Sequence, residues 1–179
     1  MIICMINGYP GSGKTTFFEE TKKYCAEAYP EILVDSISSI DCIKQLAKEQ
    51  YKWDGVKTPE ARALLSKLKR ENLELVDETL CDKIYECLDI NTDSVLFIDV
   101  REPAEIERLQ RLFYCKFKIF SFSIFIERKG LDTSNLSNES DKNVENYEYD
   151  LTVHNNDIDK QTLGKVGGLM IKSFLESLG

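Results

Sequence analysis

The chain of 179 residues carries a formal net charge of -8, and 42% of its residues are hydrophobic. This length and composition fit one compact domain with a single sizeable core. The negative charge argues against a nucleic-acid backbone or an anionic membrane as a partner, because both require a basic face. We therefore expect the partner to be a small molecule.

The six cysteines are spread through the chain without a C-x-x-C pair, and the sequence contains a single histidine. A zinc site needs a closer set of such ligands, so we do not expect one. Cysteines dispersed among apolar segments are typical of small core residues in a reducing compartment. The first residues lack the basic region of a signal peptide, and the longest apolar stretch, 117–126, is too short to cross a bilayer. We therefore expect a soluble, cytoplasmic protein.

The chain begins with an apolar run at residues 2–6, which predicts a buried strand, and residues 15–28 have the apolar stripe of an amphipathic helix. Between them, residues 8–15 read GYPGSGKT. Every fixed position of the phosphate-loop pattern G-x-x-x-x-G-K-[ST] is filled, in the strand and helix context that the pattern requires. This motif predicts a site for a nucleoside triphosphate.

The loop residues have distinct expected roles in holding ATP. Glycines allow successive backbone N–H groups to face the phosphates, and the helix N-terminus adds its positive dipole. Lys14 supplies a mobile cation for the β and γ phosphates, and the Thr15 hydroxyl is a ligand for Mg²⁺. The expected ATP-binding residues are Gly8, Gly11, Ser12, Gly13, Lys14, Thr15 and Thr16.

A second apolar run, 31–35, predicts a strand that ends in Asp35. A carboxylate there either orients an acceptor hydroxyl or caps the helix that follows. Residues 38–93 form an all-helical stretch in at least three pieces, and one piece begins at Thr58, an N-cap residue followed by Pro59 at the first helical position. We expect 38–93 to be a helical insert in an otherwise alternating fold.

The third apolar run, 94–99, predicts a strand that ends in Asp99. A carboxylate at this position beside a phosphate loop is placed to face Mg²⁺ or its water ligands. Arg101 follows two residues later, at the carboxyl edge of the sheet, where open α/β sheets bind their ligands. The alternative for Arg101 is a surface ion pair with Glu102 or Glu105.

The rest of the chain adds a helix at 103–112, a strand at 117–126, a weaker strand at 149–154 and a helix at 159–178. Residues 127–150, between the last two strands, form a polar tract that is expected to be either a functional lid or a disordered loop. Near-continuous apolar strands alternating with helices predict a parallel sheet covered on both faces. We therefore expect a single α/β domain over residues 1–179, with five strands in a three-layer α/β/α arrangement.

Among the classes of protein that carry a phosphate loop, we expect this chain to be a small kinase. A GTPase would carry an N-K-x-D guanine motif and an ABC-type ATPase an L-S-G-G-Q motif, and the sequence contains neither. A kinase needs an acceptor pocket and a cover that excludes water, since water would otherwise take the phosphoryl group. The helical stretch 38–93 and the polar tract 127–150 are placed to be these two parts.

Four segments together resemble the phage-type deoxynucleoside monophosphate kinases and their bacterial relatives. They are GYPGSGKTT at 8–16, YKWDGVKTPEARALL at 51–65, DVREPAEIERL at 99–109, and YEYDLTVHNN at 147–156 with TL at 162–163. The resemblance implies a P-loop kinase fold with a five-stranded parallel sheet, a helical acceptor-binding insert and a short lid. It also implies transfer of the γ-phosphate of ATP to a nucleotide monophosphate with Mg²⁺.

The resemblance also assigns roles on the acceptor side. It implies that Arg101 lies near the acceptor phosphate and that Arg128, at the base of the lid, faces the transferring phosphoryl group. The WDGVK segment would line the acceptor pocket, with Trp53 or Tyr51 as a surface for the base. The expected catalytic residues are Lys14, Asp99, Arg101 and Arg128, and the expected acceptor-binding residues are Asp35, Trp53, Lys57, Arg62 and Arg101.

Several alternatives stay open on the sequence alone. The acceptor is either a (deoxy)nucleoside monophosphate or another hydroxyl compound such as dephospho-CoA. A polar tract with few cations and many acidic residues also fits an ATP-binding regulatory module that transfers no phosphate. The sequence predicts either a monomer or a homodimer.

Overall fold

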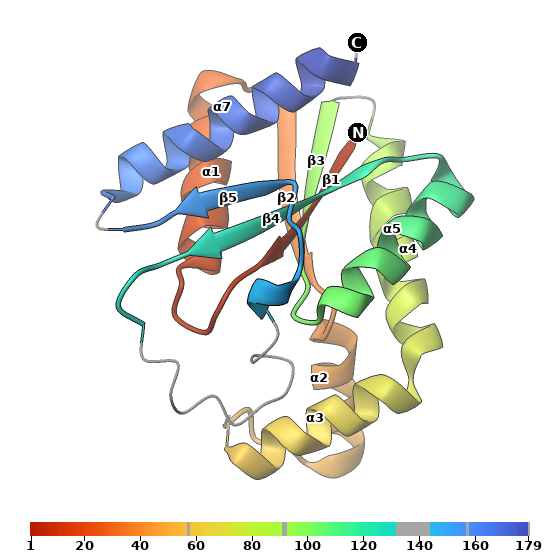
Figure 1. The fold of residues 1–179 in the computed structure, drawn as a ribbon. Coiled ribbons are helices and arrows are strands. Elements are labelled where there is room, and N and C mark those ends of the chain that lie inside the picture. Colours follow the sequence, from red (N-terminus) through yellow and green to blue (C-terminus); the bar gives the residue numbers. More distant parts are fainter. Residues whose placement is uncertain (57, 91–92, 132–143, 157, 179) are drawn as a thin grey trace.

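The computed structural model describes residues 1–56, 58–90, 93–131, 144–156 and 158–178. The strands are β1 (Ile2–Asn7), β2 (Ile32–Ser38), β3 (Asp93–Asp99), β4 (Ser121–Glu127) and β5 (Leu151–His154). The helices are α1 (Lys14–Ala28), α2 (Asp41–Tyr51), α3 (Pro59–Glu71), α4 (Leu73–Asp89), α5 (Pro103–Phe117) and α7 (Lys160–Leu178), with a short 3-10 helix at Val144–Asn146. Figure 1 shows their arrangement.

The five strands form one parallel sheet in the order β2-β3-β1-β4-β5. This order confirms the expected α/β fold. Ile6 near the end of β1 lies in register with Asp99 at the end of β3, and Asp99 lies in register with Ser38 at the end of β2. The carboxyl ends of these three strands therefore meet at one edge of the sheet.

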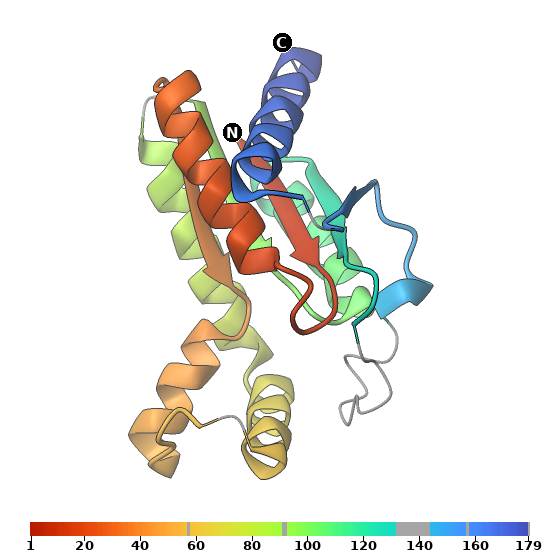
Figure 2. The same cartoon turned by 90° about the vertical axis from the view of Figure 1, so that its left-hand side faces the viewer.

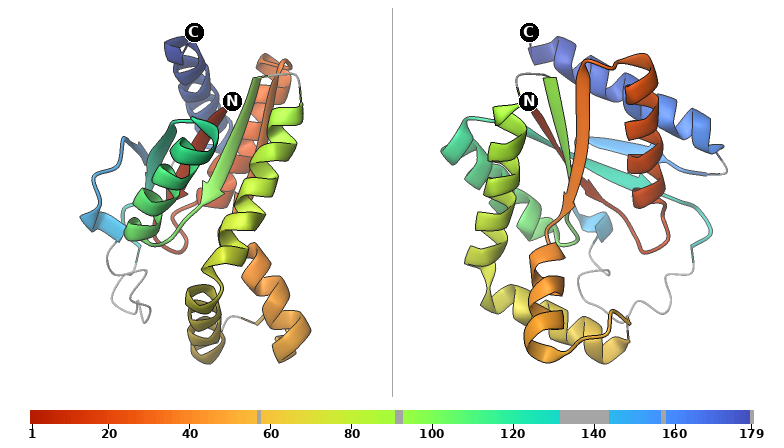
Figure 3. Two further views of the ribbon diagram at one scale, coloured as in Figure 1. Left: turned by 90° about the vertical axis from the view of Figure 1, so that its right-hand side faces the viewer. Right: turned by 180° about the vertical axis from the view of Figure 1, so that it is seen from behind.

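Each face of the sheet packs against its own helices, α1 and α7 on one face and α4 and α5 on the other (Figure 3). Alternate residues of a strand point to opposite faces, so β1 contributes to both cores. Cys4 and Ile6 belong to the same core as Phe17 of α1, whereas Met5 belongs to the core that contains Phe113 of α5. The sheet is thus the middle layer of three.

Helices α2 and α3 project from the carboxyl edge of the sheet, below the main body in Figure 2. Helix α3 begins as predicted, because the Thr58 hydroxyl accepts a hydrogen bond from the backbone N–H of Ala61 at 3.2 Å and Pro59 fills the first helical position. The third helix of the stretch, α4, packs on the sheet through Leu80 and Ile84. Among the three helices of this stretch, α2 and α3 therefore project away from the sheet.

The sequence predicted a strand at 117–126, and this prediction was wrong for residues 117–120. Helix α5 continues to Phe117, whose ring packs against Tyr85 with ring centroids 4.9 Å apart. Lys118 then adopts a left-handed conformation with φ of 59°, which ends the helix, and β4 starts only at Ser121. The apolar run is thus divided between two elements. None of the described helices is long and apolar enough to cross a membrane.

Candidate phosphate-transfer site

The loop between β1 and α1 packs closely against two other segments. Gly13 has a φ of 97°, and a Cβ atom there would collide with the side-chain amide of Asn155, which donates to the Ser12 carbonyl at 2.8 Å. A Cβ atom at Gly8 would lie 2.6 Å from the carbonyl oxygen of Ile126. Both positions therefore require glycine, because the backbone of the loop lies against the end of β4 and the segment after β5.

Lys14 is the first residue of α1, and its side chain folds back over the loop. Its Nζ donates to the carbonyl oxygens of Gly8 at 2.6 Å and Tyr9 at 3.3 Å. The side chain of the next residue, Thr15, lines the same cavity as Lys14, whereas Thr16 does not line it. An ammonium group, a hydroxyl and the N-terminal turn of a helix thus lie together at one wall.

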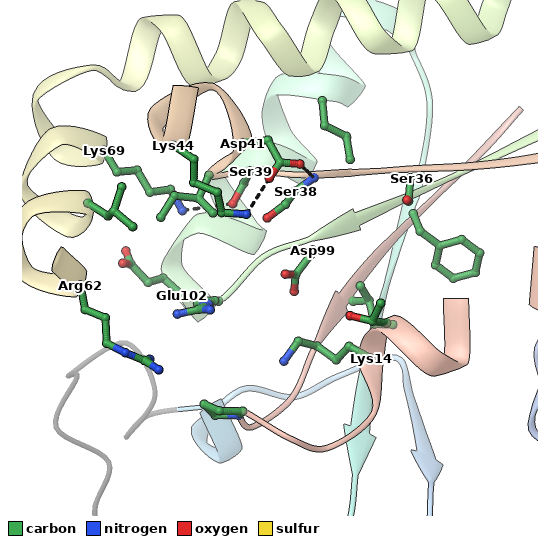
Figure 4. A pocket seen from close by; sticks show the side chains of 18 of the residues that line it. Lys14, Ser36, Ser38, Ser39, Asp41, Lys44, Arg62, Lys69, Asp99 and Glu102 are labelled. Atoms are coloured by element: carbon green, nitrogen blue, oxygen red, sulfur yellow. Dashed lines mark hydrogen bonds and ion pairs between the residues drawn. The ribbon is translucent and has the colours of Figure 1, made fainter. Parts of the chain in front are cut away.

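A cavity of about 490 Å³ opens between this wall, the carboxyl ends of β2 and β3, and the helices α2 and α3 (Figure 4). The expected site residues that line it are Gly11, Lys14, Thr15, Trp53, Arg62, Asp99 and Arg101. The structure therefore brings together residues that were expected to contact the phosphate donor and residues that were expected to contact the acceptor.

The cavity gathers positive charge in an acidic protein. Five of the residues that line it are lysine or arginine, and three are aspartate or glutamate, although the whole chain carries a net charge of -8. One of these lysines, Lys44, makes an ion pair with Asp41 at 2.7 Å, drawn in Figure 4. A concave surface with an excess of cations concentrates anionic ligands.

Asp99 ends β3, and its carboxylate points into the cavity opposite Lys14 (Figure 4). Its Oδ1 is buried and has no hydrogen-bond partner among the described residues. A buried carboxylate oxygen is costly unless a cation or water completes its contacts. Thr15 and Asp99 fit Mg²⁺, which takes one or two protein oxygens when phosphates and water supply the rest. The described residues hold no group of three side chains able to bind a metal alone.

Trp53, in the turn after α2, and Arg62 of α3 line the cavity on the side of the projecting helices. The indole N–H of Trp53 donates to the carbonyl of Val56 at 2.9 Å, so it is used within the turn after α2 and the ring offers the cavity an apolar surface. Arg62 lies in the first turns of α3 and directs its guanidinium toward the cavity (Figure 4). Lys57, the other cation expected here, lies outside the described residues.

The expectation that Asp35 ends a strand was wrong, because β2 continues to Ser38. Its carboxylate contacts Lys83 of α4 at 2.8 Å and Lys22 of α1 at 3.8 Å, and it does not line the cavity. Partial burial would raise the pKa of Asp35, but hydrogen bonds from Lys83 and the backbone N–H of Ser36 lower it overall. Asp35 thus joins β2 to α4, away from the acceptor side.

The start of the expected lid runs beside the segment that holds the phosphate loop. The backbone N–H of Lys129 donates to Oδ1 of Asn156 at 2.6 Å, and Asn155 next to it bonds to the loop. Arg128 is exposed and does not line the cavity. Residues 132–143, the centre of the tract, lie outside the described residues.

The cavity also contains polar residues that the sequence did not single out: Ser36, Ser38, Ser39, Asp41, Lys44, Ser66, Lys69 and Glu102. Serines and charged residues near the ends of strands and on helices form no motif, so no local pattern separates them from surface residues. The sequence did contain a pattern from which the burial of Lys69 could have been predicted. It follows the spacing of Leu65 and Leu68 on the buried face of α3, and it is itself buried.

No protein-family model matches the sequence, and no curated protein matches it. Solved structures share its fold over nearly the whole chain. The tunicamycin resistance protein of Deinococcus radiodurans has a TM-score of 0.58 at 11% identity, over 95% of both chains. The APS kinase of Mycobacterium tuberculosis, in complex with AMPPNP and APS, has a TM-score of 0.53 at 14% identity, over 96% of this chain and 97% of that chain.

A sugar kinase from Janibacter has a TM-score of 0.51 at 10% identity, over 96% of this chain and 95% of that chain. At such identities the likeness concerns the fold. The chain has the three-layer fold of P-loop kinases, with the phosphate loop after the central strand.

Proposed function

We propose that the protein is an ATP- and Mg²⁺-dependent kinase that phosphorylates a (deoxy)nucleoside monophosphate, as its resemblance to the phage-type kinases implies. The observation that carries this proposal is one cavity lined by Lys14 and Asp99 beside the phosphate loop, by Trp53 in the turn after α2 and by Arg62 on α3. The fold that it shares with an APS kinase bound to AMPPNP supports the donor side of the proposal.

On the donor side, the backbone N–H groups of the loop and the N-terminus of α1 would hold the β and γ phosphates. The ammonium of Lys14 already lies over the loop carbonyls of Gly8 and Tyr9, and phosphate oxygens would take their place as its partners. Mg²⁺, held near Thr15 and Asp99 when bound, would supply further neutralisation of the phosphate charge. Phosphoryl transfer needs positioning and charge neutralisation more than reactive side chains.

On the acceptor side, Arg62 and Arg101 would bind the acceptor phosphate through charge-assisted hydrogen bonds. The ring of Trp53 would give the base a flat apolar surface. We propose that Lys57 adds a cation to this pocket and that Arg128 reaches the transferring phosphoryl group when the lid closes. Closure would also exclude water from the γ-phosphate.

The direct test supplies the purified protein with ATP, Mg²⁺ and a panel of deoxynucleoside and ribonucleoside monophosphates, and detects ADP and the diphosphate product by chromatography. We expect at least one monophosphate to be phosphorylated. If none is, the acceptor assignment fails, and dephospho-CoA and other hydroxyl compounds become the acceptors to examine.

Lys14→Ala tests the donor site separately. We expect it to abolish tight ATP binding in calorimetry, because the phosphates lose their mobile cation while the loop glycines remain. Unchanged ATP affinity in this variant would overturn the assignment of the phosphate loop, whatever the acceptor is.

A second candidate function is an ATP-binding module that regulates a partner without transferring phosphate. It is favoured by one observation, that Arg128 is exposed and does not line the cavity. Under this alternative, ATP binding is independent of every acceptor, and Arg101→Ala and Arg128→Ala change no measured property. Loss of phosphoryl transfer in either variant would exclude it.

A further inference from the structure

A buried ion pair lies at the wall of the cavity where the projecting helices meet the sheet. Lys69 of α3 is 7% exposed and Glu105 of α5 is 6% exposed. The Lys69 ammonium contacts the Glu105 carboxylate and also donates to the Ser39 hydroxyl at 3.1 Å. Figure 4 shows Lys69 reaching toward Ser39. Three side chains from three separate segments thus form one buried polar cluster.

Ser39 is bonded to the strand end that carries Asp99, and Glu105 lies in the first turn of α5, which follows that strand. The backbone N–H of Ser39 donates to the Asp99 carbonyl at 3.1 Å, and the backbone N–H of Glu105 donates to the Glu102 carbonyl at 2.9 Å. Glu105 also belongs to the segment 99–109, which begins with Asp99 and contains Arg101. Lys69 therefore joins α3 to Ser39, which is bonded to Asp99, and to Glu105 on the helix that follows Arg101.

The Glu105 carboxylate is held from a second side as well. Its Oε1 lies 4.0 Å from the guanidinium of Arg108, which in turn contacts both carboxylate oxygens of Asp77 on α4 at 2.6 Å. Burial raises the pKa of Glu105, and the Lys69 ammonium opposes that shift. Glu105 Oε1 makes no hydrogen bond among the described residues, so Lys69 supplies the direct contact to the carboxylate.

Stability alone does not account for a buried pair of this kind. Well-packed apolar side chains of similar volume often serve stability equally well or better, because two charges must be removed from water. An ion pair with a shared hydrogen bond is directional, however, and it fixes the position of one helix against another. Lys69 lies seven residues after Arg62, about two turns along the same face of α3, and both line the cavity.

We propose that Lys69 and Glu105 are positioning residues, whose ion pair sets the place of α3, and with it Arg62, relative to Asp99 and Arg101 across the cavity. This inference rests on the proposed kinase function for its kinetic consequence. Neither residue acts on the reacting atoms. They set the distance between the acceptor-binding wall and the phosphate loop, on which phosphoryl transfer depends steeply.

The first test is Lys69→Met, which keeps the apolar stem and removes the charge. We expect kcat/KM for the acceptor to fall by about 10- to 100-fold, while the dissociation constant for ATP, measured by calorimetry, stays within about twofold of wild type. Lys67→Met is the matched control, because Lys67 lies on the same helix in an exposed pair 3.8 Å from Glu71. The control should leave acceptor kinetics unchanged.

A double variant separates positioning from folding stability. Lys69→Met with Glu105→Leu leaves no unpaired buried charge, so we expect its melting temperature to recover toward wild type while acceptor kcat/KM stays low. Lys69→Arg keeps the charge and should recover part of the kinetics. If the double variant regains stability and acceptor kinetics together, the pair has only a structural role and the inference is overturned.

The failure of the proposed function can be told apart from the failure of this inference. If wild type phosphorylates no acceptor, hydrogen exchange of residues 59–71 is compared in the ligand-free wild type, Lys69→Met and the double variant. We expect faster exchange in α3 of both variants and unchanged exchange in α1 and α7. Unchanged exchange in α3 would overturn the inference, as would normal acceptor kinetics of Lys69→Met in an active enzyme.

Discussion

At Gly13 of the phosphate loop, backbone conformation and packing both favour glycine. Its φ of 97° is a conformation that residues with a Cβ rarely adopt, and an added Cβ would also collide with the Asn155 amide. That amide holds the loop through the Ser12 carbonyl. A side chain at this position therefore disturbs both the loop and the residue that supports it.

Gly13→Ala is expected to lower the free energy of unfolding by about 1–3 kcal/mol and to weaken ATP binding, because the first turn of α1 must shift. Urea unfolding and calorimetric titration with ATP measure the two effects. Gly55→Ala is the matched control, since Gly55 has a φ of 94° and no atom lies within 4 Å of an added Cβ. Equal losses in both variants would show that the collision with Asn155 is unimportant.

The cysteines differ in burial, and we expect them to differ in reactivity for that reason. All six are free, and burial raises the pKa of Cys4 to about 12 and that of Cys25 to about 11. Cys115 is exposed. Since the thiolate is the reactive form, we expect iodoacetamide at mildly alkaline pH to alkylate Cys115 first and Cys4 only after unfolding. Peptide mass spectrometry measures the order, and equal rates for both cysteines in the folded protein would contradict it.

At the scale of elements, β2 serves two different surfaces. Ser36 and Ser38 line the cavity, whereas Asp35, one residue before Ser36, bonds to Lys83 of α4. Successive side chains of a strand point to opposite faces of the sheet, which explains why Asp35 and Ser36 contact different parts of the molecule. It also explains why a carboxylate close to the end of a strand is a poor guide to the site when the exact end is unknown.

Asp35→Asn is expected to lower the free energy of unfolding by about 1 kcal/mol near neutral pH. Because the folded-state pKa of Asp35 lies below its ordinary value, its contribution is complete above the unfolded-state pKa, about 4. It is lost as the pH falls through the folded-state pKa. Urea unfolding across this acid range measures the difference, which should vanish at the acid end.

The control for this prediction is Glu71→Gln, which removes the carboxylate of an exposed pair with Lys67. It should change stability by less than about 0.5 kcal/mol. A difference between Asp35→Asn and wild type that persists unchanged at low pH would show that packing, and not the ion pair with Lys83, is responsible.

At the scale of the whole molecule, we expect a nucleotide to raise the stability of the fold, because a ligand that binds only the folded state shifts the unfolding equilibrium. A non-hydrolysable ATP analogue with Mg²⁺, at about 100 times its dissociation constant, adds about 2.7 kcal/mol. For a chain of this size we expect the melting temperature to rise by roughly 5–10 °C. Thermal unfolding followed by circular dichroism measures the rise.

Lys14→Ala is the control for the nucleotide effect, and its melting temperature should not respond to the analogue. A further rise when a monophosphate is added to the wild-type complex would identify an acceptor that binds. No rise of the wild type with the analogue would contradict the donor site.

Local patterns were sufficient for most of the fold. The apolar runs of β1 and β3, the helical stripe of α1 and the cap at Thr58 depend on residue types and their spacing, and the structure has these elements where they were predicted. The error at 117–120 has a physical cause. Phe117 is apolar whether it ends a helix or starts a strand, so its hydrophobicity cannot separate the two.

By itself, then, the sequence determined the phosphate-loop motif and the alternation of strands and helices, because each depends on residue types and their spacing along the chain. The near-continuous apolar strands also predicted a parallel sheet, although its strand pairs join residues far apart in the chain, such as Ile2 and Val95. Only the tertiary structure decided which polar side chains share the cavity. Lys69 lies 30 residues from Ser39 and 36 residues from Glu105 along the chain. Their contact depends on how α3 and α5 pack at the carboxyl edge of the sheet, which no local pattern specifies.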